Sequence, residues 1–487
     1  MLKRVISMAL LLLMLTLSLV ACGDNNTGTD TSKAESDTTK AQTDTIKLYP
    51  NVDDVDYGGA TFSILSHDSI AENSWLSVTS DMFVEATNGD SLNDAIYNRN
   101  AKIEDLLNIK LEITMLKSGT STELEKVIAA GDNPYQAVNQ KMNFSSTLFN
   151  KGLIQDLNDC DFDFEAPWWD IESIKSFTIA GSIFGVVSDM TYIDKLSTCV
   201  TFYNKDLAED LGLPDLYSLT TDGDFTYEKM LEYANLAVLE NGDGKQDEND
   251  RYGISCQNDG SYYFLHSAGI LVATNDGENR PEFNLLSDTA IDALEKIFTM
   301  MNDKTLYFNR QTYGMTVAQV ANLFAQDKAL FMFRPLQSLF DLRSLDSNFG
   351  IIPMPKFDED QSNYHCSVNP YSATVFCLPK LSNNIDMVTN VIETMAAESY
   401  YTVMPEFYDV VLDVKLVDDP KISGMLDLIF DDRVYDLGMI WKFGGIDKVI
   451  VVSSMQSITS SIKSIEPSVN LAIDSLMDEV AKIQAEQ

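Results

Sequence analysis

Apolar and polar residues alternate along the chain with two different periods, which predict interleaved strands and helices. Residues 61–65 form a short apolar run, and residues 110–116 alternate between apolar and polar side chains, as β-strands do. Between them, residues 93–107 repeat their apolar side chains with helical spacing, and a further helix is predicted at residues 122–130. Strands that alternate with helices in this way favour a layered α/β domain.

The same periods recur further along the chain. Residues 289–301, 386–395 and 468–483 have helical spacing, whereas residues 372–378 alternate like a strand. Pro467 precedes the last of these helices, and we expect it in the first helical turn, where proline is tolerated. No internal repeat is visible, and a length of 487 residues is typical of about two to three domains.

The N-terminus has a pattern of its own. Lys3 and Arg4 precede an apolar run over residues 5–20, which is followed by Ala21 and Cys22. A basic start, an apolar run and a small residue before the cut predict a secretory signal peptide over residues 1–21. The run is shorter than the ~20 apolar residues that span a bilayer, which argues against a permanent transmembrane helix.

The tetrapeptide Leu-Val-Ala-Cys that ends at Cys22 resembles a bacterial lipobox. This resemblance implies that Cys22 is lipidated and becomes the first residue of the mature protein; the alternative is an ordinary signal peptide followed by a chance cysteine. Residues 23–47 contain almost no large apolar side chain and cannot bury enough surface to fold. We therefore expect residues 22–57 to form a flexible tether, with the folded part beginning near Tyr57.

The chain is strongly acidic, with a formal net charge of −40. Such a surface repels nucleic acid and anionic headgroups, so we expect no nucleic-acid partner and a membrane contact through the lipid alone. Long anionic ligands are disfavoured for the same reason, although a local basic pocket still admits a small one. Hydrophobic residues make up 45% of the chain, enough for a sizeable core, and no run after Cys22 is long and apolar enough to span a membrane.

Five cysteines remain if Cys22 is acylated. The number is odd, and the sequence contains no CxxC motif and no Cys/His cluster, which argues against a zinc site and against a full disulfide framework. One or two bridges and buried free thiols both stay open. The residues concerned are Cys160, Cys199, Cys256, Cys366 and Cys377.

Short motifs follow one another in a fixed order over the central part of the chain. They read Gly-Leu-Ile-Gln-Asp-Leu at 152–157, Tyr-Asn-Lys-Asp-Leu at 203–207, Phe-Ala-Gln-Asp-Lys-Ala-Leu at 324–330 and Phe-Gly-Ile-Ile-Pro-Met-Pro at 349–355. In this order the chain resembles the family 1 extracellular solute-binding proteins, the maltose-binding type, over roughly residues 60–487. Gln326 and Asp327 stand where a glycine is usual in that family.

This resemblance implies a type II periplasmic-binding-protein-like fold, an α/β architecture of two lobes joined by hinge crossings. Residues 58–190 and 370–440 would form the first lobe, and residues 191–369 would form the second, completed by C-terminal helices over residues 441–487. The ligand would bind between the lobes and shift the population towards a closed form. Permease subunits of an ABC importer would then recognise that form.

The function expected from the resemblance is a lipid-anchored receptor on the extracellular face of the membrane, acting as a monomer and performing no bond chemistry. The aromatic content favours an oligosaccharide ligand, with a peptide or another small solute as the alternative. Two other classes remain, a surface-anchored glycan hydrolase and an adhesive surface lipoprotein. The sequence has no GxSxG, HExxH, P-loop or GxGxxG motif, and its three histidines lie far apart.

Sugars have apolar faces that aromatic rings cover and hydroxyl edges that polar side chains bind. Trp168 and Trp169, adjacent on a predicted loop, are the aromatic candidates; the alternative is that they pack between helices. The resemblance adds further candidate ligand-binding residues near the ends of strands and turns: Ser66, His67, Asp68, Asn143, Tyr263, Arg334 and Trp441.

An acidic segment at residues 239–250 resembles a calcium-binding loop. Oxygen-bearing side chains alternate around glycines, which suits Ca²⁺, and the candidate ligands are Asn241, Asp243, Asp247 and Asp250. Leu239 occupies the first ligand position, where Asp is usual; this departure removes a ligand, for which Glu240 could substitute. The alternative is a solvated acidic turn. No cofactor is otherwise expected.

Overall fold

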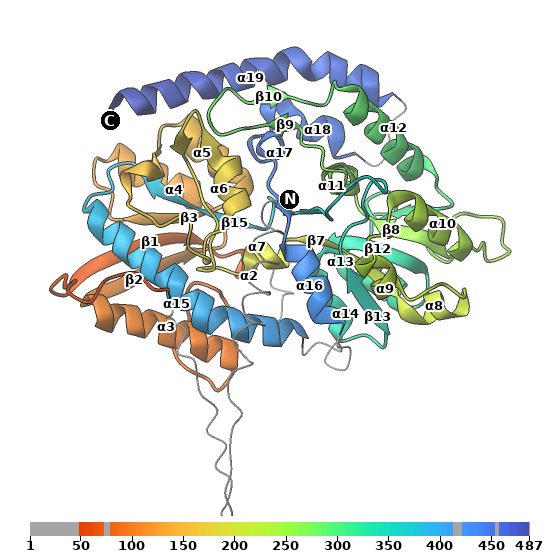
Figure 1. The fold of residues 1–487 in the computed structure, drawn as a ribbon, viewed down its shortest axis with the longest axis horizontal. Helices are drawn as coiled ribbons and strands as arrows, with labels where there is room; N and C mark the ends of the chain where they lie inside the picture. The colour runs from red at the N-terminus through yellow and green to blue at the C-terminus, as the bar shows by residue number, and fades with distance from the viewer. Residues whose placement is uncertain (1–47, 73–77, 413–420, 453–456, 487) are drawn as a thin grey trace, which may run out of the picture. The chain divides into compact units, whose positions relative to one another are not determined.

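The computed structural model describes residues 48–72, 78–412, 421–452 and 457–486 (Figure 1). The predicted signal peptide, Cys22 and most of the predicted tether lie outside the described residues. Within the described ranges, every helix is too short or too polar to cross a membrane.

The first of two five-stranded sheets is built from the N-terminal part of the chain and one later strand. β1 pairs in parallel with β2 and β3, whereas β15 runs antiparallel to β3 and β4. The strand order is β2 (Ile109–Leu116), β1 (Ala60–His67), β3 (Ala137–Lys141), β15 (Thr374–Pro379) and β4 (Ile154–Gln155).

Helices cover both faces of this sheet. On one face α3 (Ser91–Leu107) contacts the long α15 (Ile385–Leu412), and the two lie side by side in Figure 1. Phe62 of β1, Ile103 of α3 and Val391 of α15 are fully buried in one hydrophobic cluster, which is why alternate strand residues and one helix stripe are apolar. The remaining helices of this part are α2 (Ser69–Glu72), α4 (Thr120–Ala129), α5 (Ser145–Asn150) and α6 (Ile171–Phe177), with the short η1 (Met142–Phe144) and η2 (Leu157–Asp159).

The second sheet has the same mixed pattern. β8 is parallel to β11 and β12, and β7 is antiparallel to β12 and β13. The strand order is β11 (Tyr307–Asn309), β8 (Tyr252–Cys256), β12 (Ala329–Pro335), β7 (Cys199–Asn204) and β13 (Phe349–Ile352). Its helices are α8 (Lys205–Asp210), α9 (Leu216–Thr221), α10 (Tyr227–Ala237), α11 (Gly260–Ser267), α12 (Asp288–Asn302), α13 (Val317–Ala325), α14 (Leu339–Arg343) and the short η3 (Leu336–Ser338).

The chain crosses between the two sheets more than once, and the crossings contact each other. The first crossing carries α7 (Ile193–Leu196) into β7, and the second leads from β13 back to β15. Thr198 and Val368 form an isolated bridge between them, and Ser372 Oγ donates to Ser197 Oγ at 2.8 Å. This arrangement confirms the two-lobed α/β fold expected from the resemblance.

The C-terminal elements return to both sheets. They are α16 (Ile422–Phe430), β16 (Arg433–Val434), α17 (Leu437–Trp441), η4 (Phe443–Gly445), α18 (Asp447–Ile450) and α19 (Ile458–Glu486). α19 contacts α12 beside the second sheet and α5 beside the first. The described residues also contain three two-stranded pairs: β5 (Thr178–Ile179) with β6 (Ser182–Ile183), β9 (Ala273–Thr274) with β10 (Glu282–Phe283), and β14 (Cys366–Ser367) with β16.

The elements predicted from periodicity agree with the structure in type, with two corrections. The helix predicted at 386–395 continues to residue 412, and Pro467 lies inside α19 rather than in its first turn. Ile458 and Ile462 are buried on α19 before the proline, and Val469 and Ile473 continue the buried face after it. Packing of this continuous face offsets the hydrogen bond that Pro467 cannot make.

The cysteines form no disulfide bonds among the described residues. All five cysteines after Cys22 are buried and free. Burial raises the pKa of the Cys366 and Cys377 thiols to about 12, which keeps these side chains protonated and unreactive.

Candidate functional site

The carboxyl ends of parallel strands are where open α/β sheets place their ligands. In the first sheet β1 ends at His67 and β3 ends at Lys141; in the second, β8 ends at Cys256 and β12 at Pro335. Four of the candidate residues named from the resemblance lie in the last positions of the first pair of strands or shortly after them, and two more lie at or after the ends of the second pair. The candidate site is therefore built from the residues at these ends.

The candidates after β1 are largely occupied by local contacts. Ser66 is buried and accepts a hydrogen bond from Asn139 Nδ2 at 3.1 Å. His67 is buried and its Nε2 lies 3.1 Å from Glu72 Oε2; burial lowers the pKa of His67, and the carboxylate opposes that shift. Asp68 accepts from the Ala71 N–H at 2.8 Å, so it closes the turn into α2.

The end of β3 presents one polar and one aromatic side chain. The Asn143 backbone N–H donates to Pro370 O at 2.9 Å, which joins this strand end to the second crossing. Its side-chain Oδ1 is buried and has no hydrogen-bond partner. The next residue, Phe144, is 47% exposed. An unmet acceptor beside an exposed ring suits the polar edge and apolar face of one sugar.

Lys442 connects this ring to a second one. Its Nζ lies 5.7 Å from the centroid of Phe144 and 5.2 Å from that of Tyr371. Lys442 has φ 54°, a left-handed conformation that non-glycine residues rarely adopt, and burial lowers the pKa of its ammonium. The preceding candidate, Trp441, packs its indole against Phe149 and Phe177 and leaves its Nε1 buried without a partner.

A chain of hydrogen bonds leads from Tyr371 to residues that lie beside the second sheet. The Tyr371 N–H donates to Asn369 Oδ1, and Asn369 Nδ2 donates to the hydroxyl of the predicted residue Tyr263, both at 2.9 Å. Tyr263 in turn lies 3.4 Å from Asp259 Oδ2. Burial raises the pKa of Asp259, although the charges of Arg334 and Arg310 oppose this.

These contacts bring side chains from both sheets and from the crossing into one continuous set. Three of the nine residues predicted from the sequence, Asn143, Tyr263 and Arg334, belong to this set, whereas Ser66 bonds to Asn139 and Trp441 packs against Phe149 and Phe177. We call the following residues the strand-end cluster: Asn143, Phe144, Asp259, Tyr263, Arg310, Arg334, Asn369, Tyr371 and Lys442.

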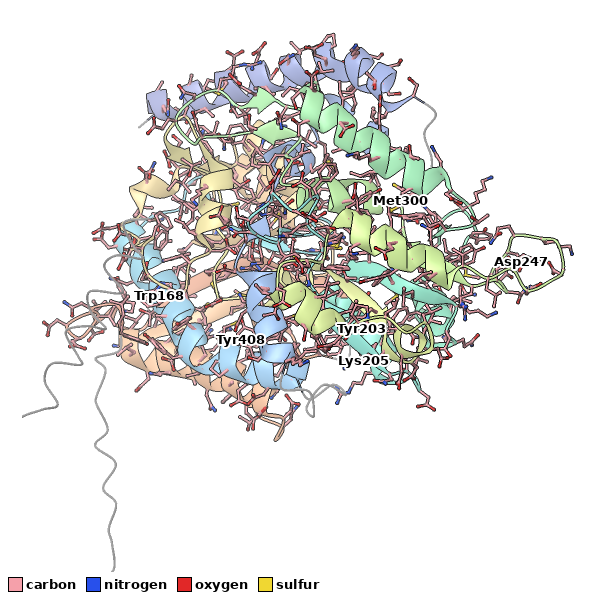
Figure 2. The ribbon with its side chains drawn as sticks, turned by 45° about the vertical axis from the view of Figure 1, so that its right-hand side comes forward. Trp168, Tyr203, Lys205, Asp247, Met300 and Tyr408 are labelled. Atoms are coloured by element: carbon pink, nitrogen blue, oxygen red, sulfur yellow. The ribbon has the colours of Figure 1, made fainter. Side chains whose placement is uncertain are left out.

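Trp168 and Trp169 lie elsewhere, in the core beside α15. They are 2% and 6% exposed, and both indole N–H groups donate to the same atom, Glu393 Oε1, at 2.5 and 3.1 Å. Figure 2 shows Trp168 beside the long helix rather than between the sheets. Both tryptophans are therefore packed inside the protein, which was the alternative to a position in the ligand cleft.

The acidic loop at 239–250 is tied by its own backbone. Asp250 accepts from the Asn241 and Asp247 N–H groups at 3.0 Å, and Asp243 accepts from the Lys245 N–H at 2.8 Å. Figure 2 shows Asp247 on a loop that projects from the fold. Within the described residues, no group of three or more His, Cys, Asp or Glu side chains is placed to hold a metal ion.

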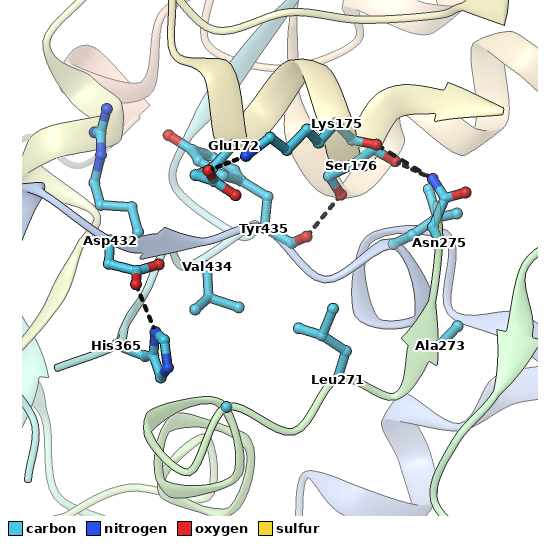
Figure 3. Close-up of a pocket in the computed structure, with 13 residues that line it drawn as sticks. Glu172, Lys175, Ser176, Leu271, Ala273, Asn275, His365, Asp432, Val434 and Tyr435 are labelled. Carbon is cyan, nitrogen blue, oxygen red and sulfur yellow. Dashed lines mark hydrogen bonds and ion pairs between the residues drawn. The ribbon is translucent and has the colours of Figure 1, made fainter. Parts of the chain in front are cut away.

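A pocket of about 250 Å³ lies between α6, the segment 269–275 and the residues around β16 (Figure 3). His365 Nδ1 lies 3.2 Å from Asp432 Oδ2, and this hydrogen bond lowers the pKa of Asp432. Lys175 pairs with Glu172 at 2.6 Å on the opposite wall. The charged side chains of both walls therefore already have partners within the protein.

Six residues of the strand-end cluster were not predicted from the sequence: Phe144, Asp259, Arg310, Asn369, Tyr371 and Lys442. Phe144 directly follows the predicted Asn143, so an aromatic residue next to a candidate loop position was the available signal. Tyr371 and Asn369 belong to the Asn-Pro-Tyr segment that enters β15, a turn signal at a lobe crossing. No local sequence pattern marks Lys442, because its place in the cluster depends on its contacts with Phe144 and Tyr371, which are far away in the sequence.

Solved structures resemble this one in fold at low sequence identity. A cyclo/maltodextrin-binding protein complexed with maltotetraose has a TM-score of 0.54 at 17% identity, covering 87% of this chain and 98% of that one. UgpB from Mycobacterium tuberculosis, in complex with glycerophosphocholine, has a TM-score of 0.55 at 15% identity, with coverages of 86% and 99%. The MalE domain of Bdellovibrio bacteriovorus, bound to maltotriose, has a TM-score of 0.51 at 13% identity, with coverages of 85% and 100%.

Sequence comparison gives a family but no individual relative. No curated protein matches the chain. The model of a protein family, described as the bacterial extracellular solute-binding proteins, matches residues 91–380, which is more than half of the chain. Together with the two-lobed fold, this match means that the chain belongs to the family of bacterial extracellular solute-binding proteins.

Proposed function

We propose that this protein captures an oligosaccharide between its two lobes at the strand-end cluster and delivers it to an ABC importer. The observation that carries the proposal is the combination of Phe144, an exposed ring, with Asn143 and Arg334, which each keep a buried polar atom without a partner. Rings of this kind cover the apolar face of a sugar, and polar groups of this kind meet its hydroxyls.

Closure follows from where these groups are attached. Phe144 and Asn143 belong to the first sheet's part, Tyr263 and Arg334 to the second's, and Asn369 and Tyr371 to the crossing between them. A ligand that contacts both parts at once gains all of its contacts only when the lobes approach each other. It therefore shifts the population of the protein towards the closed form.

The proposal also covers how the receptor is anchored, how its lobes are divided and which proteins recognise it. Lipid attachment at Cys22, the lobe boundaries predicted from the sequence, a monomeric state and recognition by permease subunits stay part of it. The structures that share this fold and carry maltotetraose or maltotriose support a saccharide ligand. The family match supports a binding protein over a hydrolase, because the family is named for solute binding.

A thermal-shift screen of the purified protein against oligosaccharides and peptides, with product analysis of each hit, tests the proposal. A ligand that binds only the folded state raises the Tm with its occupancy. We expect a saccharide to raise the Tm and to be recovered intact. Recovery of cleaved saccharide would support the hydrolase, and a shift with peptides alone would exclude the carbohydrate assignment.

A further inference from the structure

Arg334 is a buried cation with few partners. Its side chain is 4% exposed, and its one recorded hydrogen bond runs from Nε to Ser338 Oγ at 3.0 Å. Its Nη1 is buried without a partner. Arg99, which is also buried, instead bonds two side chains and three backbone carbonyl groups. A buried charged donor without an acceptor is unfavourable. Arg334 therefore lacks the hydrogen-bond acceptors that stabilise the buried guanidinium of Arg99.

Arg310 places a second guanidinium near the first. It directly follows β11, and β11 and β12 are the two neighbours of β8 in the sheet. Its Nε donates to Gln257 Oε1 at 3.1 Å and its Nη1 to Met315 O at 3.0 Å. Burial and the charge of Arg334 both lower the pKa of Arg310, which means that the two cations repel each other.

The carboxylates that interact with the charges of Arg334 and Arg310 form no direct ion pair with either guanidinium. Among the described residues, neither guanidinium has a carboxylate oxygen within the 4.0 Å of an ion pair. Asp259 Oδ2 accepts instead from Gln257 Nε2 at 2.6 Å, and Asp341 Oδ2 is buried without a partner. Burial raises the pKa of both carboxyl groups, and Arg334 opposes that shift.

Two other buried cations of this acidic chain, Lys195 and Arg433, are paired directly with carboxylates. Lys195 Nζ lies 2.7 Å from Asp189 Oδ1, and Arg433 contacts both Asp170 and Asp194. Within the described residues, Arg334 and Arg310 lack the ion pairs that Lys195 and Arg433 have, and Arg334 also lacks the five hydrogen bonds of Arg99. This arrangement occurs at the strand ends, inside the cluster to which the ligand is assigned.

We propose that the captured solute is a short acidic oligosaccharide, whose carboxylate or phosphate group is bound by Arg334 and Arg310. This inference rests on the proposed function and specifies the ligand of the same site. Guanidinium groups bind carboxylate and phosphate through paired N–H donors, and such charge-assisted bonds are the strong ones. The acidic surface elsewhere disfavours long polyanions, which limits the ligand to a short chain.

Matched pairs of saccharides test this inference by thermal shift and calorimetry. One pair is short oligogalacturonates and their methyl esters; the other is glucose oligomers with and without a phosphate monoester. We expect the charged member of a pair to bind at least ~10-fold more tightly, as one charge-assisted bond allows. Preference for the uronates identifies a carboxylate, and preference for the phosphorylated sugars identifies a phosphate.

The outcomes separate this inference from the proposed function. Binding of neutral saccharides as tightly as their acidic counterparts would overturn the inference and leave the receptor assignment standing. Failure of every saccharide, charged and neutral, to bind would contradict the proposed function itself.

A variant pair supplies a readout that does not depend on choosing the right sugar. Arg334→Met removes the charge and retains most of the volume, and Arg343→Met on the exposed side of α14 is the matched control. We expect the ligand-free Tm of Arg334→Met to equal or exceed that of the parent protein, because an uncompensated buried charge is removed. Binding of the acidic probe should fall ~10- to 100-fold while the neutral match is retained.

A purely structural role for Arg334 predicts the opposite pattern. The ligand-free Tm of Arg334→Met would then fall, and charged and neutral probes would lose affinity equally. Arg310→Gln, which keeps a donor toward Met315, should reproduce the selective loss to a smaller degree.

Discussion

The side-chain amide of Asn369 donates a hydrogen bond to the hydroxyl of Tyr263 at 2.9 Å. Asn369 belongs to the second crossing, whereas Tyr263 lies on α11 beside the second sheet. The same amide accepts from the Tyr371 N–H, so one side chain orients the ring of the crossing and holds it against the polar residues of the second lobe.

Asn369→Ala should therefore weaken ligand binding more than it weakens folding. The substitution leaves the Tyr371 N–H without its acceptor and leaves the Tyr263 hydroxyl with the longer bond from Gln257 Nε2 at 3.3 Å, and we expect affinity for the saccharide to fall ~10-fold. Calorimetry measures this loss. Asn363→Ala, at an exposed position of the same crossing, is the control, and equal losses in both variants would contradict the role given to Asn369.

Phe144→Ala should reduce affinity without reducing stability. The ring is 47% exposed, so its removal leaves little cavity, whereas stacking of an aromatic ring is worth about 0.5–1.5 kcal/mol, or up to ~10-fold in affinity. Tyr97→Ala on α3 removes another ring of similar exposure, 38%, and should leave affinity unchanged. Unchanged binding by Phe144→Ala would remove the ring from the site.

Sequence reasoning located the elements better than the site. The periods of two and of 3.6 residues identify β1, β2 and α3 because each of these buries one face against a neighbour. They give no information on where a side chain finds its partner. Trp168 and Trp169 look like cleft residues because two adjacent indoles on a loop cannot easily share a core, yet Glu393, far away in sequence, accepts a hydrogen bond from both.

The same physical reason explains the residues that were missed. Phe144 and Tyr371 join the strand-end cluster because Lys442 lies near both rings, and this contact brings three distant segments together. The resemblance to known solute-binding proteins predicts Asn143, Tyr263 and Arg334 as ligand-binding residues because a resemblance carries topology, which periodicity does not. The structure places these three residues in the strand-end cluster.

Glu393 should make the stability of the protein depend on pH. Burial raises its pKa from 4.5 to about 7, although hydrogen bonds from Trp168 and Trp169 oppose the shift. Between these values the folded chain keeps a proton that the unfolded chain releases, so the free energy of unfolding falls as the pH rises from about 4.5 to about 7. Buried Asp81, whose pKa is also raised to about 7, adds a slope of the same sign.

Glu393→Gln should flatten this dependence in part, because the amide has no proton to lose and its oxygen can still accept from an indole. Urea unfolding at a series of pH values measures the slope. The exposed Glu165→Gln should leave the slope as it is in the parent protein. A slope in Glu393→Gln as steep as that of the parent would show that Glu393 does not carry this proton.

Arg433→Ala should strongly destabilise the fold. Arg433 contacts Asp170 and Asp194, and the side chains of Arg433 and Asp194 are 8% and 0% exposed. Among the described residues, removal of Arg433 leaves Asp194 with only the longer 3.5 Å contact to Lys195 and Asp170 with only neutral donors such as the Tyr435 hydroxyl, at a cost of about 3–5 kcal/mol. The exposed pair Arg280–Asp474 provides the control, since Arg280→Ala should cost about 1 kcal/mol or less in urea unfolding. Similar losses in the two variants would contradict this account of the buried network.

The most direct test of the account is X-ray scattering from the purified protein with and without the saccharide that gives the largest thermal shift, followed by analysis of that saccharide. Capture between two lobes predicts that the radius of gyration falls at saturation and that the saccharide is recovered intact. A saccharide that binds without any change in the radius of gyration, or that is recovered cleaved, would contradict it.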